Sequence, residues 1–284
     1  NRPDKLNALT LRTTDELRHA LIEADGNEAV VGIVLTGAGR GFCAGLDLSE
    51  IEEYQDAGTT EVSGDACDLP VSEPQSEHFS ADFERPCSYL MSLRKPVIAA
   101  INGPCVGLGL SFALFSDLRF ISSKAYLATA FAGLGLVAEH GTGWLMPRLI
   151  GISNSLDVLW SGRKVGAEEA LRLGLVTRVV EPDQLVEEAQ GYIRQLAQRS
   201  SPTSLMHMKR QIYSYLMQPL RQAMKETEAL QDESMTWPDI VEGMAAFAEK
   251  RLPDFPRIGD GRWTTDPEKR MPIAGAPTTK KRQA

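Results

Sequence analysis

Residues 95–109, KPVIAAINGPCVGLG, contain the segment that decides the fold. Residues 96–101 form an unbroken apolar run of strand length, which predicts a strand buried on both faces. The rest of the segment is rich in glycine, and the apolar residues 110–115 after it are expected to form a helix. A strand, a glycine-rich turn and a helix in succession are typical of an α/β fold. The start of such a helix leaves backbone N–H groups without partners.

The same order of elements occurs earlier in the chain. Residues 10–24 have the apolar spacing of a helix, with Thr13 and Glu16 as a capping box, and residues 30–36 are a short β-branched run. Residues 37–45 then contain four glycines. Further strands are expected at 118–122 and 176–180, and further helices at 83–94, 144–150, 184–198, 204–217, 224–233 and 240–250.

Two segments lack such periodicity. Residues 58–84 are polar and acidic, which predicts a flexible surface insertion. Residues 251–284 are rich in Pro, Gly and basic side chains, which predicts an extended or disordered tail. We therefore expect an α/β core over residues 1–200 and a C-terminal helical region with a tail over residues 201–284. The first residues read like the interior of a protein, so we expect that others precede Asn1.

The composition excludes several classes of function. The formal net charge is −8 and the pI is about 5.2, so no positive field would gather the phosphates of a nucleic acid. No apolar run reaches the ~18 residues of a membrane span, and no signal-peptide pattern is present. The four cysteines form no CxxC pair and the four histidines have no metal-ligand spacing. We expect a cytoplasmic, reduced protein without a metal ion and without a membrane or nucleic-acid partner.

Two glycine-rich loops, residues 36–48 and 101–110, each follow a predicted buried strand. Side by side, such loops can direct two backbone N–H groups at one oxygen and so form an oxyanion hole. Alternatively, the glycines only permit turns and close packing. Neither loop matches a nucleotide-binding motif, because the second lacks the third glycine of the dinucleotide fingerprint and the first lacks the Gly-Lys-Ser/Thr of a P-loop.

Several motifs together carry a resemblance to a known family. They are Asn1-Arg-Pro3, Leu6-Asn-Ala8, Gly41-Phe-Cys-Ala-Gly-Leu-Asp-Leu48, the segment 95–109, Ser116-Asp-Leu-Arg119, Gly135-Leu-Val-Ala-Glu-His-Gly141, Leu145-Met-Pro-Arg148 and residues 167–176. In this order, from residue 1 to about residue 217, the chain resembles the enoyl-CoA hydratase/isomerase (crotonase) family of fatty-acid β-oxidation. The resemblance implies a spiral of repeated ββα units with a C-terminal helical trimerisation region, as a homotrimer or a dimer of trimers.

The resemblance also implies a substrate and its binding residues. The substrate would be an acyl-CoA thioester, with coenzyme A as part of the substrate and no tightly bound cofactor. The thioester oxygen would accept hydrogen bonds from the backbone N–H groups of Leu46 and Leu108. The further residues expected to bind substrate or CoA are Lys5, Leu6 and Ala8 along the pantetheine, Ala44, Asp47 and Leu48 at the adenine, and Gly107, Ser111 and Phe131.

The acid/base groups decide the reaction. Hydratases of this family resemble one another in carrying two glutamates, at the positions of Ser111 and Phe131, and neither is present here. Glu139 lies where isomerases of the family carry a carboxylate, and one carboxylate suffices to move a proton from C2 to C4 of a 3-enoyl thioester. Apolar neighbours such as Phe131 and Trp144 are expected to exclude water and raise the pKa of Glu139. Alternatively, Glu139 caps the following helix.

The sequence thus favours a Δ3,Δ2-enoyl-CoA isomerase-like enzyme with Glu139 as acid/base. An enoyl-CoA hydratase, another thioester chemistry such as hydrolysis, dehalogenation or decarboxylation, and a non-catalytic acyl-CoA-binding homologue stay open. His140 either tunes Glu139 or faces solvent, and Asp117 is expected to be structural.

Overall fold

A computed structural model of the chain describes residues 1–47, 49, 83 and 85–258, and two sheets form its centre. The first has the strand order β1-β2-β4-β7 and is parallel throughout. The second has the order β3-β5-β6, in which only β5 and β6 are antiparallel. The strands are β1 (Ile33–Thr36), β2 (Val97–Ile101), β3 (Cys105–Val106), β4 (Leu118–Ser122), β5 (Tyr126–Ala128), β6 (Val165–Gly166) and β7 (Arg178–Val180).

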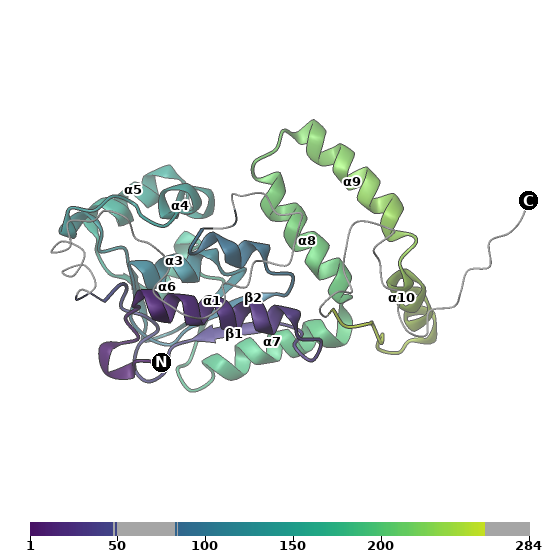
Figure 1. Cartoon of the computed structure of the whole chain (residues 1–284), viewed down its shortest axis with the longest axis horizontal. Coiled ribbons are helices and arrows are strands. Elements are labelled where there is room, and N and C mark those ends of the chain that lie inside the picture. Colours follow the sequence, from purple (N-terminus) through teal and green to yellow (C-terminus); the bar gives the residue numbers. More distant parts are fainter. Residues whose placement is uncertain (48, 50–82, 84, 259–284) are drawn as a thin grey trace, which may run out of the picture.

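Helices surround the sheets and extend beyond them on one side (Figure 1). The α-helices are α1 (Leu11–Gly26), α3 (Leu108–Phe115), α4 (Thr142–Ile150), α5 (Ile152–Ser161), α6 (Ala167–Leu173), α7 (Leu185–Arg199), α8 (Pro202–Tyr215), α9 (Leu220–Ser234) and α10 (Pro238–Glu249). The 3-10 helices are η1 (Pro3–Lys5), η3 (Ser88–Ser92) and η4 (Ala132–Leu134). None of these described helices combines the length and apolar character needed to cross a bilayer.

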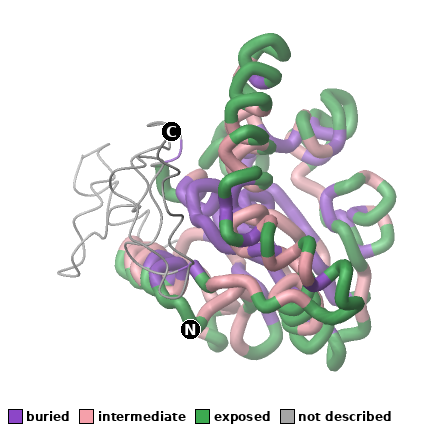
Figure 2. Tube along the Cα trace, turned by 90° about the vertical axis from the view of Figure 1, so that its right-hand side faces the viewer, coloured by how far each residue is buried: buried purple, intermediate pink, exposed green. Residues whose placement is uncertain are grey.

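Strand β2 supplies the centre of the core, as its apolar run predicts. Its five residues are fully buried and alternate between two clusters. Val97, Ala99 and Ile101 face the larger cluster, which includes residues of α1, α3 and η3, and Ile98 and Ala100 face α7. All residues of α3 are buried, and the exposed positions gather on the outer helices (Figure 2). The α/β class predicted from the sequence is confirmed.

Asp117, immediately before β4, attaches α8 to the core. Its carboxylate accepts hydrogen bonds from the backbone N–H of Val97 at 2.7 Å, from Lys209 Nζ at 2.8 Å and from Tyr213 Oη at 2.8 Å. Lys209 Nζ also donates to two backbone carbonyl groups, at 3.1 Å each. The structural role expected for Asp117 is therefore observed.

Two local expectations are wrong. The helix predicted over residues 83–94 is reduced to the 3-10 helix η3, because Pro86 has no N–H to donate and disfavours a helical conformation at Arg85. The capping box expected between Thr13 and Glu16 is not formed: helix α1 begins at Leu11, and its N-cap Thr10 forms the capping box with Thr13. The predicted insertion at 58–84, apart from residue 83, and the tail beyond residue 258 lie outside the described residues.

Candidate functional site

The two glycine-rich loops lie against each other along their backbones. The N–H groups of Phe42 and Cys43 donate to the carbonyl of Pro104, both at 3.1 Å, and the N–H of Val106 donates to the carbonyl of Cys43 at 2.9 Å. The Asn102 side chain fixes the start of the first loop. Its Nδ2 donates to the carbonyl of Gly37 at 3.0 Å, and its Oδ1 accepts a hydrogen bond from the N–H of Gly37 at 3.1 Å. The expectation that these loops meet is confirmed.

Glycine is required where the loops touch. A Cβ atom on Gly109 would lie 2.6 Å from both the Cβ and the carbonyl oxygen of Cys43. Gly45 has a φ of +105°, which side chains rarely adopt, and a Cβ on it would lie 3.8 Å from the backbone nitrogen of Leu108. Leu46 directly follows Gly45, so the structure brings the loop carrying Leu46 against the start of α3 at Leu108.

The backbone N–H groups of Leu46 and Leu108 share one property. Neither donates a hydrogen bond to any residue within the described part of the chain. For Leu108 the reason is its place as the first residue of α3, where no preceding turn offers an acceptor and the helix dipole is positive. Two unpaired donors on adjoining loops can hold an oxygen that carries negative charge.

The N-terminal segment runs beside the first loop. The N–H of Leu9 donates to the carbonyl of Gly45 at 2.8 Å, and the N–H of Asp47 donates back to the carbonyl of Leu9 at 2.8 Å. The N–H of Ala44 donates to the carbonyl of Leu6 at 3.0 Å. These bonds place Lys5, Leu6 and Ala8, which sequence reasoning assigned to CoA, next to Ala44 and Asp47.

The amides of Ala44 and Asp47 thus donate hydrogen bonds within the protein. Leu48 lies outside the described residues.

The Asp47 carboxylate is compensated inside this region. Arg2 forms an ion pair with it at 2.7 Å, and Ser49 Oγ donates to it at 2.9 Å. The Arg2 hydrogen bond, and then those of Ser49, lower the pKa of Asp47 to about 2. Arg2 also donates to the carbonyl of Ala8 at 2.8 Å. The ion pair therefore fixes the N-terminal segment to the first loop.

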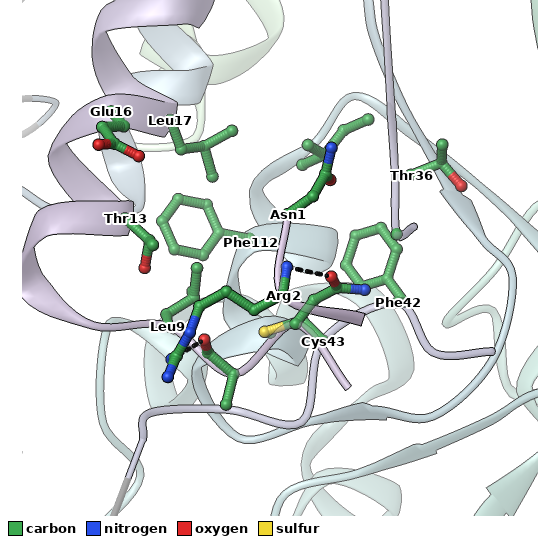
Figure 3. A pocket seen from close by; sticks show the side chains of 15 residues that line it. Asn1, Arg2, Leu9, Thr13, Glu16, Leu17, Thr36, Phe42, Cys43 and Phe112 are labelled. Atoms are coloured by element: carbon green, nitrogen blue, oxygen red, sulfur yellow. Dashed lines mark hydrogen bonds between the residues drawn. The ribbon is translucent and has the colours of Figure 1, made fainter. Parts of the chain in front are cut away.

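A pocket of about 270 Å³ lies between the N-terminal segment, α1 and the first loop (Figure 3). Thr13 and Glu16 contribute polar groups to it, and Cys43 lies at its wall. Burial raises the pKa of the Cys43 thiol to about 11, so this thiol is protonated and a poor nucleophile. Neither Leu46 nor Leu108 lines this pocket.

Comparisons with known proteins bear on this geometry. The model of the family described as enoyl-CoA hydratase/isomerase matches residues 1–257. The probable enoyl-CoA hydratase echA12 of Mycobacterium bovis is 35% identical over 258 residues, which cover 90% of this chain and 87% of that protein. The 1,2-epoxyphenylacetyl-CoA isomerase of Escherichia coli K12 is 33% identical over 256 residues, covering 90% of this chain and 92% of that protein.

A solved structure agrees with these matches. The enoyl-CoA hydratase from Bacillus anthracis superposes with a TM-score of 0.74 at 28% identity, covering 90% of this chain and 93% of that one. The chain belongs to the enoyl-CoA hydratase/isomerase family. Its fold is the crotonase-like α/β fold that the sequence motifs predict.

This member of the family has no carboxylate at the two positions where the sequence analysis expects hydratase glutamates. Ser111 is fully buried in α3, and its hydroxyl donates to the carbonyl of Gly107 at 3.3 Å. Phe131 is buried immediately before η4. Gly107, with a φ of +53°, donates its N–H to the carbonyl of Ala128 at 3.1 Å. Neither Ser111 nor Phe131 can act as a general base at neutral pH.

Glu139 lies on the turn before α4, and its side chain is 35% exposed. Its backbone carbonyl, not its carboxylate, accepts the N–H and the hydroxyl of Thr142, at 3.0 and 2.7 Å. The N-cap of α4 is Gly141 and receives no side-chain hydrogen bond, so the capping role weighed for the Glu139 side chain is not observed. Within the described residues, the carboxylate accepts no hydrogen bond, and the titratable side chain beside it is His140.

His140 Nε2 lies 3.9 Å from the Glu139 carboxylate, and the His140 side chain is 32% exposed. Burial lowers the pKa of His140, and the opposing effect of Glu139 is smaller. The imidazole is therefore neutral at pH 7. The sequence left two roles open for His140, an effect on Glu139 and exposure to solvent. Its side chain is exposed over only about a third of its surface.

Sequence reasoning missed a cavity of about 420 Å³ that His140 lines. Its walls come from segments far apart in the chain, so no contiguous motif could indicate it. The lining residues are Phe83, Arg85, Pro86, Cys87, Ser88, Met91, Phe115, His140, Gly141, Trp144 and Met217. In the part of the chain that the structure describes, no three His, Cys, Asp or Glu side chains are arranged to hold a metal ion.

Proposed function

We propose that the protein is an acyl-CoA-processing enzyme that shifts a double bond from the Δ3 to the Δ2 position, with Glu139 as its acid/base. The observation that carries this proposal is a carboxylate on the turn before α4 that accepts no hydrogen bond from any residue the structure describes, in a family member that lacks both hydratase glutamates. A relative at 33% identity that is named an isomerase is consistent with it.

The thioester oxygen would accept hydrogen bonds from the N–H groups of Leu46 and Leu108. When a base removes a proton from C2, negative charge moves onto this oxygen, and the two donors stabilise the resulting enolate. Loss of one such donor costs roughly 10²- to 10³-fold in kcat. Glu139 would take the proton from C2 and return it to C4, so that the reaction consumes no water and needs no second carboxylate.

The CoA portion of the substrate would lie along the N-terminal segment and the first loop. The backbone at Ala44 and Asp47 would meet the adenine, and Lys5, Leu6 and Ala8 would follow the pantetheine path. Lys5 is exposed and can approach a phosphate group. In this proposal coenzyme A is part of the substrate, and no other cofactor takes part.

We also propose that the chain acts as a homotrimer or a dimer of trimers. Large apolar side chains are exposed on α10, with Phe247 at 88%, and on α5, where Trp160 is exposed. Exposed apolar surface of this kind marks protein–protein contacts. Light scattering on the purified protein should give three or six times the mass of one chain, and a monomer would contradict this part of the proposal.

A second candidate is an enoyl-CoA hydratase, because relatives such as echA12 carry that name. The absorbance of the conjugated thioester separates the two. We expect wild-type protein to convert 3-enoyl-CoA into the conjugated 2-enoyl form, and Glu139→Gln to lower the rate by about 10²- to 10⁴-fold. Glu168→Gln, on an exposed residue of α6, is the matched control.

The other outcomes decide against the proposal. An unchanged rate in Glu139→Gln would exclude Glu139 as the acid/base. Loss of 2-enoyl-CoA absorbance without any conversion of 3-enoyl-CoA would favour the hydratase. Binding of both thioesters without turnover would favour a non-catalytic acyl-CoA-binding protein.

A further inference from the structure

The 420 Å³ cavity is walled mainly by apolar side chains from four parts of the chain. Phe115 ends α3, Trp144 lies in α4, Met91 lies in η3 and Met217 follows α8. Polar groups at its wall come from Arg85, Ser88 and His140. A mainly apolar cavity of this size with few polar groups is typical of a site that binds an apolar ligand or part of one.

The cavity adjoins the residues of the proposed function. His140 lines it, and the carboxylate of Glu139 lies 3.9 Å from the imidazole. Helix α3 links the cavity to the proposed oxygen-binding amide of Leu108. The helix begins at Leu108 and ends at Phe115, which lines the cavity. With a rise of about 1.5 Å per residue, these two residues are roughly 10 Å apart along the helix. An acyl group held at the Leu108 amide would extend along this helix to fill the cavity, and we expect a four-carbon chain to be too short.

The volume sets the size of the occupant. An apolar cavity of ~150 Å³ in another protein holds one benzene molecule. The cavity here, at about 420 Å³, is nearly three times as large. It has room for a phenyl group with its linking chain, or for a straight chain of comparable size. The imidazole of His140 is neutral at pH 7, so it places no charge against such a group.

We propose that this cavity binds the distal part of the acyl group, and that the protein prefers apolar acyl thioesters of at least eight carbons to four-carbon ones. This inference rests on the proposed function for the position of the thioester. It adds a substrate class, and it assigns the walls of the cavity as the specificity determinants.

The test measures the binding of saturated acyl-CoA thioesters, which cannot be isomerised. We expect the Kd to fall about three- to fourfold for each methylene group added between butanoyl-CoA and octanoyl-CoA, from the free energy of burying one methylene. A 4-phenylbutanoyl-CoA arm distinguishes an aromatic from a straight-chain occupant. Binding of either ligand at least tenfold more tightly than butanoyl-CoA supports the proposal, and the tighter of the two identifies the shape.

Two variants change the cavity in opposite directions. Met217→Trp narrows it at a position that is 43% exposed and should reduce the preference for octanoyl-CoA over butanoyl-CoA at least tenfold. Trp144→Ala enlarges it and should move the tightest binding to longer chains. Met208→Trp, on α8 at 58% exposure and outside the cavity, is the matched control and should leave the preference unchanged.

The outcomes separate this inference from the proposed function. A Kd that varies less than twofold between butanoyl-CoA and decanoyl-CoA overturns the inference, as does a Met217→Trp variant that weakens all chain lengths equally. If the chain-length dependence is found but 3-enoyl-CoA is not isomerised, the cavity assignment stands and the proposed reaction fails. If 3-enoyl-CoA is isomerised without chain-length dependence, the reaction stands and the cavity assignment fails.

Discussion

Replacement of Gly109 by alanine tests whether close packing of the two loops builds the site. Gly109 is the second residue of α3, where the helical conformation itself suits alanine. The obstacle is Cys43 of the first loop, because the added Cβ would lie 2.6 Å from the Cys43 Cβ, 2.6 Å from its carbonyl oxygen and 2.8 Å from its Sγ. Since one of these atoms belongs to the backbone, the first loop must move away from α3.

The expected magnitude follows from two opposing terms. Overpacking of a buried site costs about 1–3 kcal/mol, and contact with a backbone atom places this case in the upper part of that range. Alanine in place of glycine in a helix returns up to about 1 kcal/mol. The net loss in the free energy of unfolding should be about 1–2 kcal/mol. A shift of the Leu46 donor by about 1 Å should also lower kcat roughly 10²-fold.

Urea unfolding followed by far-UV circular dichroism measures the first effect, and the 3-enoyl-CoA assay measures the second. Gly191→Ala is the matched control, because Gly191 lies within α7 and an added Cβ would meet only the end of the Arg194 side chain, at 3.8 Å. This control should be about 0.5–1 kcal/mol more stable than wild type. A Gly109→Ala variant as stable and as active as wild type would refute the role assigned to the loop contact.

Three further predictions concern stability and reactivity. Asp117→Ala should lower the free energy of unfolding by about 3–5 kcal/mol in urea titrations, because it leaves the largely buried Lys209 ammonium without its carboxylate partner. A loss under about 1 kcal/mol would contradict this prediction. Because the pKa of His140 is lowered in the folded protein, the unfolded chain binds a proton at this histidine more readily. The free energy of unfolding should therefore fall as the pH drops below about 6.5, and His140→Gln should weaken that fall. A variant with the same pH profile as wild type would contradict this prediction. In a Cys67→Ser background, a thiol reagent at pH 8 should react only after unfolding, because burial raises the thiol pKa values, and rapid reaction of the native protein would disprove this. The three thiols concerned are Cys43, Cys87 and Cys105.

Local patterns in the sequence predicted much of the fold because they depend on neighbouring residues. The apolar run of β2 and the strand β4 lie where the sequence places them, since an unbroken apolar segment bounded by polar residues and glycine favours a buried strand. The glycine-rich loops were predicted as close approaches, and Gly45 and Gly109 have the conformation or contact that this requires.

Features that depend on distant residues were not predicted. The hydrogen bond between Lys209 and Asp117 joins residues 92 positions apart, and no local pattern encodes it. The cavity beside His140 likewise draws its walls from segments brought together only by packing. The shortening of the helix predicted at 83–94 shows that one proline outweighs helical spacing.

The central claim is that the amides of Leu46 and Leu108 hold the thioester oxygen while Glu139 faces the neighbouring carbons. A crystal structure with bound octanoyl-CoA tests it most directly. We predict that the thioester oxygen lies about 2.7–3.1 Å from both backbone nitrogens, with the Glu139 carboxylate directed at C2. A thioester oxygen beyond hydrogen-bond distance of either nitrogen, or a carboxylate directed away from the acyl chain, would contradict the claim.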